Sequence, residues 1–173
     1  MDKKKKAKRK IVSSRHLANS DGWQLSEFEY GLIIAYNGFC RWMSKCMQAA
    51  GNQEMASLDI LVIHHINHRA KQKKLSDICF LLNVEDAHTV NYAIRKLLKA
   101  ELVVGKKQGK EMYYSTTKSG EELCDQYRQI REQCLLEGLT RLDMEPEDLS
   151  EIASVLRSLS GLYDQASRSA ASL

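Results

Sequence analysis

Seven polar or charged side chains between residues 86 and 100 are of the types that hydrogen-bond to the bases and phosphates of DNA. Apolar residues in the same stretch recur at three- and four-residue spacing, which predicts a helix with one buried stripe and a polar opposite face. Asparagine can pair with adenine and arginine with guanine in the major groove, whereas lysine suits phosphate contact. The predicted contact residues of this helix are His88, Thr89, Asn91, Tyr92, Arg95, Lys96 and Lys99.

A second set of cations follows this helix. Two short runs of β-forming residues, 102–104 and 112–116, flank a glycine-bounded turn over residues 105–110, which predicts a hairpin with a basic tip. Such a hairpin can lie along the DNA backbone or enter the narrow minor groove, which attracts cations. The predicted contact residues of the hairpin are Lys106, Lys107 and Lys110.

Three further helices are predicted before the helix that carries these contacts. An apolar face repeats over about residues 25–50, and Ser26 to Glu29 forms a capping box at its start. Ser57 can cap a second helix, and a third covers residues 76–82, with Asn83 as its stop. These helices must position the polar helix and the hairpin.

Two more helices are predicted after the hairpin. Thr117 can cap the first of them, and Pro146 suits the first turn of the second, after a break near residues 143–146. The order is then four helices, a hairpin and two helices. This order predicts a fold that is mainly α with a small β-hairpin wing, in the α+β class, built on a winged helix-turn-helix core.

The net charge of +4 conceals a strong local pattern. Residues 1–15 hold eight basic residues and one acidic residue, and residues 69–110 hold ten basic and four acidic residues. The remaining two stretches, 16–68 and 111–173, carry more acidic than basic residues. A basic patch set in an acidic body is typical of a protein that binds a polyanion.

Three segments resemble the MarR family of bacterial transcription regulators. LSDICFLLNV over residues 75–84 resembles the helix before the recognition helix of that family, and HTVNYAIRKLLKAELV over residues 88–103 resembles its recognition helix and the start of its wing. The threonine, glycine and leucine that follow the wing in the family match Thr117, Gly120 and Leu123. The wing departs from the family pattern, because it is shorter and has lysines in place of an Asp-x-Arg element and several arginines.

The resemblance implies a sequence-specific DNA-binding regulator that binds a pseudo-palindromic operator on double-stranded DNA as a homodimer. It leaves open control by a small-molecule effector. Its domain organisation would be a basic flexible N-terminal arm over 1–24, a dimerisation helix over 25–56, a DNA-binding core over 57–117 and C-terminal dimerisation helices over 118–173. The apolar faces of the first, fifth and sixth helices are also longer than a small winged core can cover, which favours a two-fold dimer. The alternative is a winged-helix module that binds protein and not specific DNA.

Other chemistry finds little support in the residues. No pattern of catalytic residues is recognised, so the chain is not expected to be an enzyme, and no cofactor is expected. His64 and His68 lie one helical turn apart and could ligate zinc, but two ligands are too few, so no metal is expected. The five cysteines are odd in number and fit free thiols in a reducing cytoplasm. No apolar run approaches the ~18 residues of a membrane-spanning helix.

Overall fold

The computed structural model describes residues 22–139 and 145–173, and these form two compact units that divide between Tyr127 and Arg128. The predicted basic arm over residues 1–24 therefore lies outside the described residues except for its last three positions. No helix in the described ranges is long and apolar enough to cross a membrane. The predicted hairpin and the helices before it belong to the first unit.

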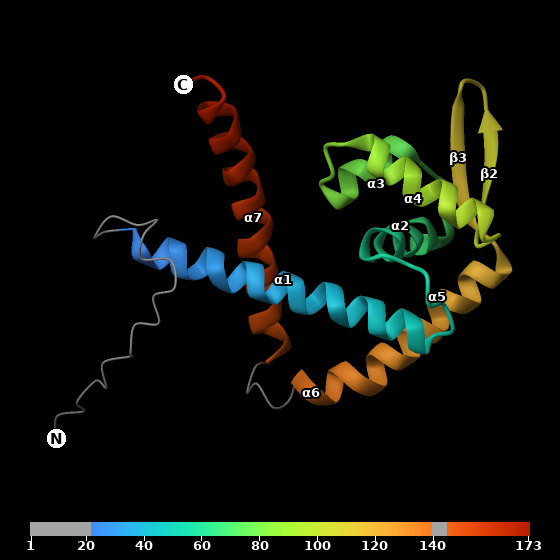
Figure 1. The fold of residues 1–173 in the computed structure, drawn as a ribbon, viewed down its shortest axis with the longest axis horizontal. Helices are drawn as coiled ribbons and strands as arrows, with labels where there is room; N and C mark the ends of the chain where they lie inside the picture. Colours follow the sequence, from blue (N-terminus) through green and yellow to red (C-terminus); the bar gives the residue numbers. More distant parts are fainter. Residues whose placement is uncertain (1–21, 140–144) are drawn as a thin grey trace. The chain divides into compact units, whose positions relative to one another are not determined.

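In the part of the chain described from residue 22 onward, four α-helices precede the hairpin, as the apolar spacing predicts. They are α1 (Trp23–Ala49), α2 (Ser57–Asn67), α3 (Leu75–Leu82) and α4 (Ala87–Lys99). Helix α2 is central, because it lies between α1 on one side and α3 and α4 on the other (Figure 1). Four of its apolar residues are fully buried and form the middle of the core: Ile60, Val62, Ile63 and Ile66.

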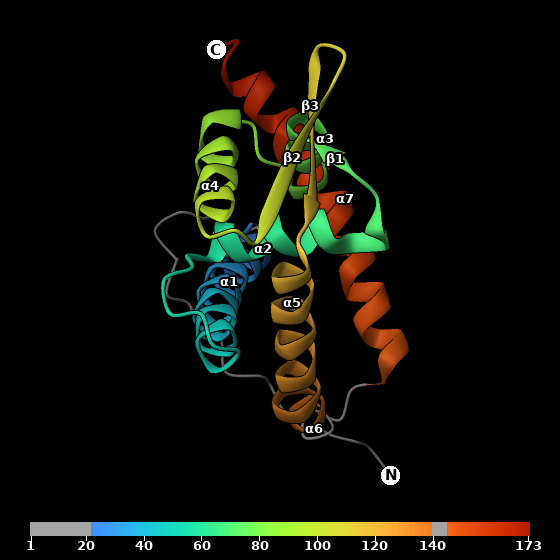
Figure 2. The ribbon, with the colours of Figure 1, turned by 90° about the vertical axis from the view of Figure 1, so that its right-hand side faces the viewer.

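The wing is part of a three-stranded antiparallel sheet with the strand order β1-β3-β2. Strand β2 (Val103–Gln108) pairs with β3 (Glu111–Thr116) from Val103 opposite Thr116 to Gln108 opposite Glu111. Figure 2 shows this hairpin extending away from α2 and α5. The hairpin is confirmed, but its turn is shorter than predicted, since residues 105–108 continue the strand.

Strand β1 (Lys73–Lys74) pairs with β3 and has no counterpart among the predicted elements. Two residues are too few to show the alternation of apolar and polar positions by which strands are recognised in a sequence. The strand brings the loop before α3 alongside the wing.

Helix α1 begins differently from the prediction. Gly22 occupies the N-cap position and makes no side-chain cap hydrogen bond, so the predicted capping box at Ser26 to Glu29 does not start the helix. Ser26 is instead buried within it, and its N–H donates to the carbonyl of Gly22 at 3.4 Å. The sequence from Trp23 to Leu25 contains no residue that breaks a helix, so the helix extends one turn further upstream.

Carboxylates rather than hydroxyls cap α2 and α3. Asp59 accepts a hydrogen bond from the N–H of Ala56 at 3.0 Å, and Asp77 accepts one from the N–H of Lys74 at 3.2 Å. The predicted cap Ser57 lies inside α2 and donates to the carbonyl of Cys40. The predicted stop of α3 is confirmed, because Asn83 takes the left-handed conformation with φ 51°.

Thr117 and Gly120 have separate structural roles at the start of the first helix after the wing. Thr117 caps α5 (Lys118–Arg131), since its Oγ1 accepts from the N–H of Gly120 at 3.1 Å and donates to the carbonyl of Glu101 at 2.8 Å. A Cβ atom on Gly120 would lie 2.1 Å from the carbonyl oxygen of Leu102. Only glycine therefore lets α5 approach the chain at the start of the wing this closely.

The described part of the C-terminal unit is mostly helical. A π-helical turn (Glu132–Leu136) and α6 (Glu137–Leu139) continue from α5, and α7 spans Pro146–Ala170 with Pro146 in its first turn, as predicted. The predicted break near residues 143–146 falls mostly in residues 140–144, outside the described ranges. Several apolar side chains of α7 are exposed: Leu149, Ile152, Val155, Leu156 and Leu162.

Candidate nucleic-acid interface

Helix α4 is held in the core by a complete apolar stripe. Val90, Ala93, Ile94 and Leu97 are each no more than 1% exposed. Asp86 caps the helix, because its carboxylate accepts from the N–H of His88 at 2.9 Å. The stripe and the cap together fix which side chains of α4 face solvent.

The outer face of α4 carries a continuous row of predicted contact residues. His88, Tyr92, Arg95 and Lys99 are all exposed, and their spacing of three or four residues places them in one line along the helix. Tyr92 is 68% exposed, which is high for a large aromatic side chain. A row of this composition can donate to and accept from base edges and can contact phosphates.

The three other residues predicted on this helix lie at the flanks of that row. Asn91 is half-buried, so it is less accessible than the row itself. Thr89 is exposed, but its hydroxyl donates to the carbonyl of Asp86 at 2.8 Å and takes part in capping the helix. Lys96 forms an ion pair with Asp59 of α2, which is 4% exposed. The structure thus places seven predicted residues on α4 but only four on its outermost line.

The wing exposes all three of its predicted lysines. Lys106 and Lys107 are exposed neighbours on β2, and successive strand residues point to opposite faces of a sheet, so the two side chains diverge. The turn consists of Gly109 and Lys110, and Gly109 has φ 62°, as the first residue of a tight two-residue hairpin turn requires. Lys110 is therefore at the tip.

A third group of cations was not among the predicted contacts. Arg69 and Lys71 are exposed in the segment between α2 and β1. Lys73 stabilises this segment, since its ammonium donates to the carbonyls of His68 and Lys71 at 2.7 and 3.0 Å. Burial, followed by the nearby charges of Lys71 and Arg69, lowers the pKa of Lys73, with Asp77 opposing. The high number of basic residues over 69–110 was the feature of the sequence that could have identified Arg69 and Lys71 as candidate contacts.

The histidines that suggested zinc do not form a metal site. The ring of His64 packs edge-on against Tyr127 with centroids 4.5 Å apart, whereas His68 is exposed. Burial, with a smaller contribution from His65, lowers the pKa of His64. Within residues 22–139 and 145–173, no group of three or more His, Cys, Asp or Glu side chains could hold a metal ion.

The arrangement of three helices, a recognition-type helix and a basic wing defines a class of protein. Residues 55–120 match the family model of the winged helix DNA-binding domain. The chain therefore contains a winged helix-turn-helix domain over these residues. A comparison with curated protein sequences finds no match.

Over about four fifths of its length the chain is similar in fold to solved MarR regulators. It is similar to Staphylococcus aureus MarR in complex with salicylate and kanamycin, with a TM-score of 0.64 and 12% identity over 82% of this chain and 93% of that one. A mutant Escherichia coli MarR complexed with operator DNA gives a TM-score of 0.65 and 13% identity over 82% of this chain and 99% of that one. A MarR family regulator from Neisseria meningitidis gives a TM-score of 0.66 and 12% identity over 83% of this chain and 95% of that one. The resemblance predicted from three short segments is confirmed as a common fold.

Proposed function

We propose that this protein is a DNA-binding transcription regulator of MarR type that binds a pseudo-palindromic operator as a homodimer. The observation that carries the proposal is the exposed row of His88, Tyr92, Arg95 and Lys99 on a helix whose opposite face is completely buried. A helix anchored in this way can be laid into the major groove without unfolding any part of its own core. The similar Escherichia coli protein was solved with operator DNA, which supports the same use of α4 here.

The wing supplies the second part of the proposed interface. Lys106, Lys107 and Lys110 are exposed, and lysines act on phosphates as point charges rather than as bidentate readers of bases. In this proposal α4 reads sequence, and the wing adds affinity that does not depend on sequence. Arg69 and Lys71 extend the positive surface next to β1.

The dimer is proposed from the apolar face that α1 leaves uncovered. Leu25, Phe28, Leu32, Tyr36 and Phe39 recur at three- or four-residue spacing, and all are exposed in the single chain. An exposed stripe of this length marks an interaction surface. A second copy of the chain would cover it and would present two copies of α4 to successive turns of DNA.

Fluorescence anisotropy with labelled duplexes from the region upstream of the coding sequence tests the proposal directly. We expect saturable binding. The logarithm of the association constant should fall linearly with the logarithm of the salt concentration. Absence of a salt-dependent complex with any genomic fragment would contradict DNA binding. The double variant with Arg95→Ala and Lys107→Ala should lose the complex, whereas a module that binds protein would keep its partner.

A small-molecule effector is proposed only as a means of control. The similar Staphylococcus aureus structure contains salicylate and kanamycin, which is a property of that protein. If this chain is regulated in the same manner, a ligand should weaken the DNA complex at fixed salt. Titration of salicylate into the preformed complex is the first measurement to make.

A further inference from the structure

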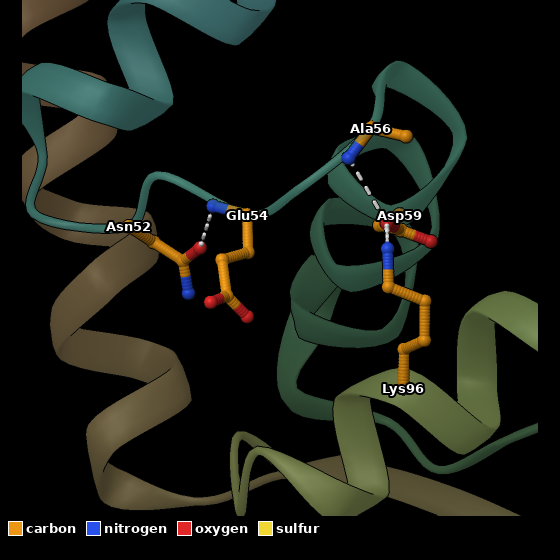
Figure 3. A network of polar contacts seen from close by, with 5 residues as sticks. All are labelled: Asn52, Glu54, Ala56, Asp59 and Lys96. Carbon is orange, nitrogen blue, oxygen red and sulfur yellow. Dashed lines mark hydrogen bonds and ion pairs between the residues drawn. The ribbon is translucent and has the colours of Figure 1, made fainter.

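One carboxylate oxygen of Asp59 accepts hydrogen bonds from two groups, a backbone N–H and a lysine ammonium. Asp59 is the third residue of α2, and its Oδ2 accepts the hydrogen bond from the N–H of Ala56 at 3.0 Å. The same oxygen accepts from the ammonium of Lys96 on α4, as Figure 3 shows. The carboxylate is 5% exposed and the Lys96 side chain is 37% exposed. The pair thus joins the first turn of α2 to the last turn of α4.

The pair lies within the proposed DNA-binding surface. It borders an open hollow of about 380 Å³ lined by Ala56, Leu58, Asp59, His88, Thr89, Tyr92 and Lys96. Four of these seven residues are predicted contact residues of α4. The ammonium of Lys96 is therefore close to the position of a bound DNA strand, yet it is directed at a carboxylate of its own chain.

Moving Lys96 from Asp59 to a phosphate would be costly. A buried carboxylate that loses its charged partner is left without compensation for its desolvation, and breaking such a pair from one side is strongly destabilising. A phosphate at the surface offers Lys96 a weaker attraction, because it is solvated and screened by salt. The ion pair should consequently persist in the complex.

We propose that Asp59 withholds Lys96 from the DNA backbone and thereby limits the affinity for DNA and its dependence on salt. Each lysine that neutralises a phosphate adds affinity for any sequence, and it adds the same amount for the operator and for competing DNA. Withholding one such lysine therefore lowers the affinity for both kinds of DNA by the same factor and reduces the salt dependence, while α4 keeps its contacts to base edges. The inference rests on the proposed function of α4 in DNA binding.

The test is the salt dependence of binding to a duplex of unrelated sequence. The variant Asp59→Asn keeps an oxygen to cap α2 but removes the charge that holds Lys96. We expect it to bind about three- to tenfold more tightly at 0.1 M salt, with a slope of log affinity against log salt that is steeper by about 0.9. Asp59→Ser keeps a capping oxygen by different chemistry and should give the same result.

Two lysine variants complete the experiment. Lys96→Gln in the wild-type background should leave the slope unchanged, and in the Asp59→Asn background it should restore the wild-type slope. Lys99→Gln, at an exposed position on the same helix, is the matched control and should lower the slope by about 0.9. Thermal melting of every variant verifies that it is folded under the assay conditions.

The outcomes separate the two proposals. An unchanged slope in folded Asp59→Asn and Asp59→Ser proteins, or a lower slope in Lys96→Gln, would overturn the role of Asp59. A wild-type protein with no salt-dependent DNA binding would overturn the proposed function itself. A steeper slope that Lys96→Gln reverses is the result that supports the inference.

Discussion

Helices α4 and α1 use their apolar residues in opposite ways. The apolar stripe of α4 is buried in its own chain, where Ile94 is 0% exposed. The buried apolar residues of α1, Met43, Cys46 and Met47, lie in its C-terminal part, while Leu32 and Tyr36 in its N-terminal half are 37% and 60% exposed. The two helices have the same kind of apolar spacing, but a single chain buries the stripe of α4 and leaves the N-terminal half of the stripe of α1 exposed.

The difference indicates which part of the molecule is complete in a single chain. The winged core encloses α2, and the apolar stripe of α4 is buried in it without a second copy of the chain. The N-terminal half of α1 exposes more apolar surface than folding of one chain can justify. A mutation in each helix should therefore be detected by a different measurement, folding stability for the core and association for α1.

The largest effect is expected where association is broken. Leu32→Glu places a charge in the middle of the exposed stripe of α1 and should convert the proposed dimer into a monomer. Loss of simultaneous binding to two half-sites should weaken operator binding by about 10²- to 10⁴-fold. Sedimentation velocity and anisotropy measure the two effects on the same samples.

Ile34→Glu is the matched control for this prediction. Ile34 is 53% exposed on the same helix, but it lies about 200° around the axis from Leu32 and so falls outside the stripe. The variant should remain a dimer with unchanged operator affinity. If the two glutamate variants have the same oligomeric state and the same operator affinity, the stripe on α1 is not the dimer interface.

The next effect is a loss of stability at the junction of the wing and α5. Gly120→Ala places a Cβ against the carbonyl of Leu102, which belongs to the backbone and cannot rotate away. We expect the free energy of unfolding to fall by about 3 kcal/mol, the upper part of the range for overpacking. Urea denaturation monitored by circular dichroism measures the change.

The same substitution in α1 sharpens the comparison. A Cβ on Gly31 meets nothing within 4 Å in the chain, so Gly31→Ala should be neutral or should stabilise the helix by up to about 1 kcal/mol. Similar losses at both glycines would show that α1 is as tightly constrained as the core.

A smaller effect is expected on DNA affinity from a single side chain of α4. Arg95 is exposed in the outer row, and Arg95→Ala should weaken operator binding by about 10- to 100-fold, the value of one bidentate base contact. Arg41→Ala removes an exposed arginine from α1 and should leave affinity unchanged. If the two variants lose affinity equally, the effect is one of net charge and not of the position on α4.

The sequence predicts these elements well wherever the pattern is local. The spacing of apolar residues identifies all four helices before the wing, and Asn83 and Thr117 end and begin helices as expected. Strand β1 was missed because two residues have no period. The start of α1 was misplaced because Ser26 and Glu29 fit a capping pattern that the upstream residues do not require.

The candidate site was predicted as a set of residues but not as a geometry. Periodicity places Lys96 on the polar side of α4, and that placement is correct. It cannot show that Asp59, which is 37 positions earlier in the chain, pairs with it. Nor can a charge count show that Lys73 is occupied by backbone carbonyls while Lys71 is exposed. Contacts between distant segments depend on tertiary packing, which a local pattern does not contain.

The smallest effect is expected from pH, and it should appear in the core and not in α1. Burial keeps the pKa of His64 below its usual value of 6.5, so the folded state binds a proton less readily than the unfolded chain. The contribution of His64 is complete above the unfolded pKa and is lost as the pH falls through 6.5 toward the folded value. Urea midpoints at pH 8 and pH 5.5 should therefore differ less in His64→Gln than in the wild type. His65 shifts in the same direction but is less buried, so His65→Gln should change the difference by a smaller amount. A dimer dissociation constant that follows the same pH profile, and loses it in His64→Gln, would show that the core and α1 are not independent.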